Sequence, residues 1–148
     1  MTTMIAGFPA REAVRRDPAT QAYVLLRIAF IVAPILFGID KFANVLTDDW
    51  TKYLSSTFND ILPGSAATGM HIVGVVEIAA GLLVAVAPRI GSLIVAGWLA
   101  GIIVNLLILG GYGDVALRDF GLLVAAIGLT RLAWAAHADH VTNSFPRS

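Results

Sequence analysis

Four long apolar runs constrain this chain more than any other feature. They lie at about residues 20–42, 66–87, 90–110 and 115–136. Each has roughly the 20 residues that an α-helix needs to cross a hydrocarbon core about 30 Å thick. None alternates apolar and polar residues as a half-buried strand would. The sequence therefore predicts an all-α membrane protein folded as a four-transmembrane-helix antiparallel bundle.

The composition agrees with a membrane protein and excludes several kinds of site. Of 148 residues, 57% are hydrophobic and 14% are charged, whereas a soluble domain is about half apolar and a quarter charged. The formal net charge is zero, so we expect no nucleic-acid partner. The absence of cysteine excludes thiol redox chemistry, thiolate metal sites and covalent haem attachment. We expect no metal site and no covalently bound cofactor.

The segments between the runs suggest how the helices are connected. Very short turns at 88–91 and 110–114 predict that consecutive helices pack as antiparallel neighbours. The longer connection at 43–65 mixes aromatic and charged residues, so we expect a short helix at the membrane interface with aromatic rings at headgroup depth. A plain solvent-exposed loop is the alternative. Polar tails at 1–19 and 137–148 complete the chain.

Basic residues near the helix ends predict the orientation. With the N-terminus inside, seven lysines and arginines fall on or near the inner side and three on the outer side. Because cytoplasmic loops carry the excess of positive charge, we expect both termini in the cytoplasm.

Polar residues within the runs fall into two groups when their depth is counted at about 1.5 Å per residue. Glu77 lies near the midplane, and Arg27 is the nearest expected countercharge. The second group lies close to the outer face and draws on all four runs: Asp40, Lys41, His71, Asn105, Arg118 and Asp119. Charges inside a membrane usually pair, face the interior of a bundle or serve a pathway.

Both groups have a structural and a functional interpretation. Glu77 either hydrogen-bonds a neighbouring helix or pairs with Arg27, or it transfers protons, binds a quinone-like headgroup, or contacts lipid or a partner. The outer group is either a layer of salt bridges that clamps helix ends or a site. Adjacent helical residues point about 100° apart, so only one of Asp40 and Lys41 faces into the bundle. The other reaches the headgroups or the outer connection.

Glycines on three runs have spacings that allow helices to approach closely. Gly97 and Gly101 are four residues apart, and Gly74 and Gly81, like Gly121 and Gly128, are seven apart. We expect these glycines to serve packing inside the bundle. An interface between two copies of the chain is the alternative.

Several short motifs resemble a known family. "FGIDKF" ends the first run, "GVVEIAAGLLV" lies in the second, "APRIG" forms the following turn, and "ALRDFGLL" lies in the fourth. Together they span about residues 22–136, and the chain resembles the DoxX-like small membrane proteins. The resemblance implies a four-helix bundle in a bacterial plasma membrane, with links to redox and quinone systems. It also implies that Lys41, Glu77 and Asp119, which match recurring polar positions, are the candidate catalytic residues.

The resemblance gives no cofactor set, but quinone or lipid is the small molecule that we consider. Its candidate ligands are Glu77, His71 and Asn105. The resemblance also favours Lys41 as the inward-facing residue with Asp119 as its partner, which makes the outer group a structural clamp first and a candidate site second. The candidate structural pairs draw on Arg27, Glu77, Asp40, Lys41, Arg118 and Asp119.

Three functions follow from these observations. The favoured one is a non-catalytic accessory or assembly subunit of a larger membrane complex, plausibly respiratory, because no nucleotide loop, haem-ligand pair or nucleophile elbow is present. The alternatives are a quinone-linked oxidoreductase subunit and a small transporter or proton pathway. Expected partners are membrane lipid and either other proteins of a membrane complex or further copies of the chain.

Overall fold

The computed structural model describes residues 4–5, 8–9 and 11–143, and it is almost entirely helical. The four long helices are α2 (Pro18–Ala43), α4 (Ala66–Val86), α5 (Pro88–Leu109) and α6 (Gly113–Asn143). The short elements are α1 (Arg11–Arg16), η1 (Trp50–Tyr53) and α3 (Ser56–Ile61). Near the N-terminus, β1 (Met4–Ile5) pairs with β2 (Phe8–Pro9) as a minimal antiparallel hairpin.

Among the described helices, three are long and apolar enough to cross a membrane: α2, α4 and α5. All three expose large aliphatic side chains, such as Leu25, Leu82 and Leu107, which are more than half exposed. In water such surfaces would be unfavourable, whereas in a bilayer they contact lipid. The predicted membrane character is therefore confirmed.

Local sequence signals fix where the helices begin and end. Asp17 caps α2 by accepting hydrogen bonds from the backbone N–H groups of Ala19 and Thr20, and Pro18 occupies the first turn. Hydrogen bonds from the Thr20 hydroxyl and backbone lower the pKa of Asp17. The turn between α5 and α6 requires positive φ at Gly110 and Gly111, a conformation that glycine adopts without a steric penalty.

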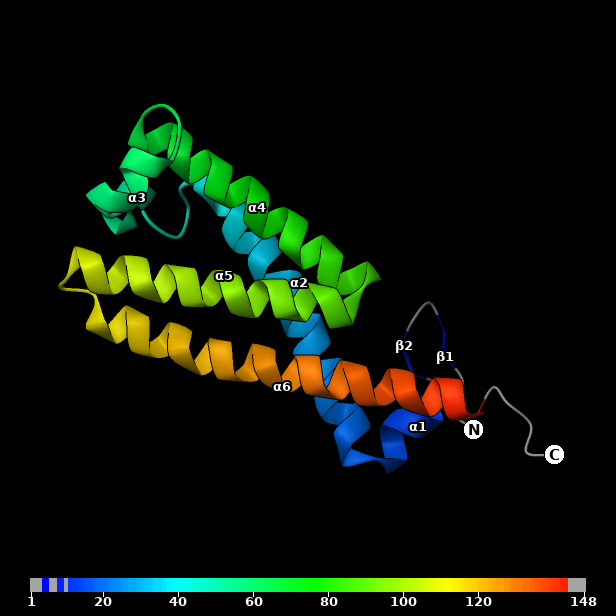
Figure 1. Ribbon diagram of the computed structural model, residues 1–148. Coiled ribbons are helices and arrows are strands. Elements are labelled where there is room, and N and C mark those ends of the chain that lie inside the picture. Colours follow the sequence, from blue (N-terminus) through cyan, green and yellow to red (C-terminus); the bar gives the residue numbers. More distant parts are fainter. Residues whose placement is uncertain (1–3, 6–7, 10, 144–148) are drawn as a thin grey trace.

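The long helices form two antiparallel pairs. α2 packs mainly on α4, and α5 packs mainly on α6. Figure 1 shows α4 and α5 joined closely at one end and diverging toward the other, where α3 lies. We call this second end the connection end, because residues 44–65 cover it, and the opposite one the terminal end.

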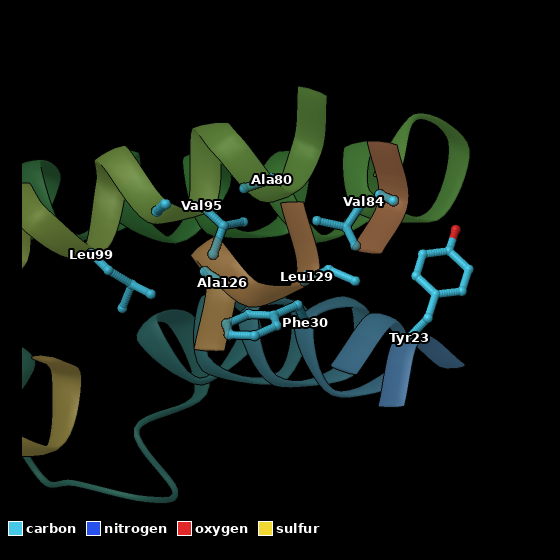
Figure 2. Close-up of a cluster of buried hydrophobic side chains, with 10 residues drawn as sticks. Tyr23, Phe30, Ala80, Val84, Val95, Leu99, Ala126 and Leu129 are labelled. Carbon is cyan, nitrogen blue, oxygen red and sulfur yellow. The ribbon is translucent and has the colours of Figure 1, made fainter. Parts of the chain in front are cut away.

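The buried apolar core lies toward the terminal end and joins the two pairs. It includes Phe30 of α2, Val84 of α4, Val95 of α5, and Ala126 and Leu129 of α6. Figure 2 shows the ring of Phe30 beneath Ala126 and Leu129, with Val95 on the far side of these two. Most of the polar residues of interest lie beyond this core, at the connection end.

The α2–α4 seam is built on glycine. A Cβ on Gly38 would lie 2.5 Å from the carbonyl oxygen of Gly74, and one on Gly74 would lie 2.7 Å from that of Gly38. One on Gly81 would lie 2.7 Å from the Ile35 side chain. The backbones therefore touch, as small residues permit in membrane helix pairs.

The predicted packing glycines of α5 and α6 behave differently, and this corrects the prediction that they serve packing inside the bundle. A Cβ added to Gly97, Gly101, Gly121 or Gly128 would have nothing within 4 Å. Among the described residues these four glycines therefore serve no close helix contact. Spacing alone could not separate them from Gly74 and Gly81, because it does not show which face of a helix meets a neighbour.

Secondary structure extends into both predicted polar tails. α6 continues through residue 143, seven residues beyond the expected helix end, and residues 144–148 lie outside the described part. The N-terminal segment contains α1 and the hairpin of β1 and β2.

Candidate functional site

A buried ion pair marks the connection end of the bundle. The Nζ of Lys41 on α2 lies 2.7 Å from Oε2 of Glu77 on α4, and the two side chains are 6% and 11% exposed. The ammonium group also lies 4.2 Å from the centre of the Trp50 ring. Hydrogen bonding, charge and a cation–π contact thus all act on one cation.

Helix polarity explains why these two residues meet. Gly38 faces Gly74, so three residues further along α2 the antiparallel register places Lys41 opposite position 71. Glu77 is six residues away, about 9 Å along the axis. Helical side chains lean toward the N-terminus of their own helix. In an antiparallel pair Lys41 and Glu77 therefore lean toward each other and close this gap.

The expected pairing of Arg27 with Glu77 is wrong for the same reason. Arg27 is 2% exposed, and it donates to the Ala85 carbonyl at 2.6 Å and to the Tyr23 hydroxyl at 3.2 Å. Ala85 is eight residues from Glu77, about 12 Å along α4, and here the two side chains lean apart. Arg27 instead places its charge against the C-terminal turn of α4, where a cation is favoured.

Asp40 points away from Lys41 and binds the connection. Its carboxylate accepts hydrogen bonds from the backbone N–H groups of Val45 and Leu46, at 2.9 and 3.1 Å, and from Nε1 of Trp50 at 2.9 Å. Asp40 therefore holds the indole whose face covers Lys41. Of the two adjacent charges, Lys41 faces the bundle and Asp40 reaches the connection.

Asn105 on α5 fixes the other side of the connection. Its Oδ1 accepts from the backbone N–H of Ser55 at 2.9 Å, and its Nδ2 donates to the Tyr53 carbonyl at 2.6 Å. The Tyr53 ring packs against Tyr112 with centroids 5.1 Å apart. Trp50 and Tyr53, the first and last residues of η1, thus pack against the bundle. The short helix predicted for this connection is present as α3.

Asp119 on α6 completes the polar cluster. It is 7% exposed, and its carboxylate lies 3.6 Å from Nε of Arg118, whose side chain is 66% exposed. The expected salt bridge from Lys41 to Asp119 is absent among the described contacts, since Lys41 binds Glu77. Asp119 is nevertheless close enough to both Lys41 and Glu77 to interact with them electrostatically.

Trp98 supplies a further polar atom to the same region. Its Nε1 is buried and has no partner of good hydrogen-bond geometry, although the indole lies beside Glu77. His71 lies apart from the cluster, exposed and stacked on Phe42 with centroids 4.7 Å apart. Of the three candidate cofactor ligands, Glu77 therefore lies in the ion pair, Asn105 holds the connection, and His71 lies outside.

The sequence patterns do not single out two tryptophans of this site. Trp50 bridges Asp40 and Lys41, and Trp98 lies beside Glu77. Both are the amphipathic aromatic type that usually finds a hydrogen-bond partner when buried, so a tryptophan near intramembrane charges was the available signal.

The cluster of Lys41, Glu77, Asp119 and Trp98 can hold charge and protons away from water. Within the described residues no group of three or more histidine, cysteine or carboxylate side chains is placed to hold a metal ion. Comparison of the chain with protein-family models, curated proteins and solved structures gives no match.

Proposed function

We propose that the chain is a DoxX-like, four-span membrane protein that acts as a non-catalytic accessory or assembly subunit of a larger membrane complex of the respiratory type. The observation that carries this proposal is the anchored connection. Buried polar side chains from two helices, Asp40 and Asn105, hold its backbone in one shape. The polar side chains of Asp40 and Asn105 thus hold the connection in place, so that its outer side chains form a defined surface.

The presented surface is apolar enough to receive a partner. Val45, Leu46 and Ile61 on the connection are 81%, 63% and 73% exposed. An anchored, exposed apolar surface is typical of a docking site. A second subunit embedded in the same membrane is the partner that this position favours, since it would meet both the connection and the lipid-facing helices.

Purification in mild detergent followed by mass spectrometry tests the proposal. We expect specific co-purifying membrane proteins with the wild type, and their loss in Asn105→Leu, which frees the connection from α5. Val104→Leu, on the neighbouring exposed position of α5, is the matched control and should retain them. Isolation of the wild type only as a monomer or homo-oligomer would contradict the proposed role.

The fourth span and the orientation have their own test, because the chain lacks cysteine. The single substitutions Asp48→Cys, Asp114→Cys and Ser148→Cys allow labelling in intact cells with a membrane-impermeant maleimide. Four spans with cytoplasmic termini predict labelling at positions 48 and 114, and at 148 only after permeabilisation. Labelling of both 48 and 148 in intact cells would show an odd number of spans.

A quinone-linked oxidoreductase subunit is the second candidate. Two donors favour it, the Lys41 ammonium and the Trp98 N–H that lacks a partner of good geometry, because a quinone offers carbonyl acceptors. In membranes that show quinone-dependent turnover, Glu77→Gln should abolish it while the protein still inserts. Unchanged turnover would remove Glu77 from such a mechanism.

A further inference from the structure

The connection end of the bundle holds more buried acid than buried base. Among the described residues there, Asp40, Glu77 and Asp119 are each less than 9% exposed, and Lys41 is the buried cation. Asp40 is stabilised separately by its three N–H donors. This leaves Glu77 and Asp119 to share one ammonium group.

The surrounding charges do not change this imbalance. The charged and titratable groups at this end of the packed helices are Asp40 and Lys41 of α2, His71 and Glu77 of α4, and Asp114, Arg118 and Asp119 of α6, while α5 contributes the uncharged Trp98 and Asn105. His71 and Asp114 are exposed. Asp48, Asp49, Lys52 and Asp60 of the connection are exposed to solvent. Arg118 contacts Asp119 only at 3.6 Å, from a side chain that is 66% exposed, so water screens it.

Two carboxylates that share one buried site with one cation cannot both stay ionised at low cost. We propose that Glu77, Asp119 and Lys41 form a binding site for one exchangeable proton. In the observed arrangement Lys41 neutralises Glu77, and the proton resides on Asp119. When Lys41 turns to Asp119, the proton passes to Glu77, whose carboxyl lies beside the Trp98 N–H. The proton comes from solvent and returns to it, and no bond between heavy atoms changes.

Infrared spectroscopy of the purified full-length protein tests this proposal directly. A protonated carboxyl has a carbonyl stretching band that an ionised carboxylate lacks. At neutral pH we expect one such band in the wild type. Both Asp119→Asn and Glu77→Gln should lose it entirely, because Lys41 keeps whichever single carboxylate remains in its ionised form. Asp60→Asn, which changes an exposed carboxyl of the connection, is the control and should keep the band.

Two results would overturn the shared site. Absence of the band in the wild type at neutral pH would mean that Arg118 neutralises Asp119. A band that survives Glu77→Gln would mean that Asp119 binds its proton independently. If Glu77→Gln does not fold, as judged by circular dichroism and gel filtration, Lys41→Gln provides the converse measurement. With the cation removed, both carboxyls should be protonated and the band should double.

Discussion

The two helix pairs of this bundle are held together in opposite ways. α2 and α4 touch through glycines whose backbones leave no room for a Cβ, and the buried Lys41–Glu77 pair joins them at the connection end. α5 and α6 pack through side chains, with one part-buried hydrogen bond between Thr130 and Ser92, and a Cβ added to Gly97, Gly101, Gly121 or Gly128 would meet nothing. Glycines therefore form a close seam in one pair and lie on open faces in the other.

The largest effect that this comparison predicts is for Lys41→Met. Removing one partner of a buried ion pair typically costs about 3–5 kcal/mol. Because Glu77 can take up a proton once unpaired, we expect the free energy of unfolding in detergent to fall by about 3 kcal/mol. The double variant Lys41→Met/Glu77→Leu should recover most of it.

The exposed pair Arg16–Glu12 is the control for this prediction. Its atoms are 3.2 Å apart, but both side chains are 80% exposed. Arg16→Met should therefore change stability by less than about 0.5 kcal/mol. Equal losses of stability in Arg16→Met and Lys41→Met would contradict the prediction that the buried pair contributes more than the exposed one.

The glycine seam should be the next most sensitive feature. In Gly74→Leu the new side chain must enter space occupied by the Gly38 backbone, and overpacking a close contact costs about 1–3 kcal/mol. Thermal denaturation in detergent should show this loss. Gly101→Leu adds the same atoms where nothing lies within 4 Å and serves as the matched control.

A smaller effect is expected at the hydrogen bond between α5 and α6. Thr130 Oγ1 donates to the Ala126 carbonyl at 2.9 Å and lies 2.9 Å from Ser92 Oγ, with which it forms a hydroxyl–hydroxyl hydrogen bond. Interhelical hydrogen bonds in membrane proteins average about 0.6 kcal/mol, so Thr130→Val should cost about that amount. A loss as large as that in Gly74→Leu would show that α5–α6 packing depends on polar contacts.

The smallest effect is predicted for the open face itself. Gly97→Ala and Gly101→Ala should change the stability of the isolated protein by less than about 0.5 kcal/mol. If this face meets another membrane helix in the cell, the same variants should weaken co-purification while leaving stability unchanged. A marked destabilisation of the isolated chain would place the two glycines at an internal contact.

Much of the fold could be predicted because apolar length is a strong signal. The apolar runs at 20–42, 66–87 and 90–110 match α2, α4 and α5 to within about two residues. The opposite directions of Asp40 and Lys41 also follow from helix geometry. Pairing was harder, because counting depth from Cα positions ignores the lean of each side chain. This lean joins Lys41 to Glu77 and separates Arg27 from it.

The Lys41–Glu77 pair also has a consequence for how the protein is made. The two residues are 36 positions apart, which at about 5–20 residues per second corresponds to about 2–7 s of synthesis. During this interval α2 has emerged from the ribosome while the acid that neutralises its lysine has not. Lys41 of α2 therefore has no partner until Glu77 enters the bilayer. Slowing translation between residues 41 and 77 should lengthen the time during which unpaired α2 is exposed to quality-control proteases.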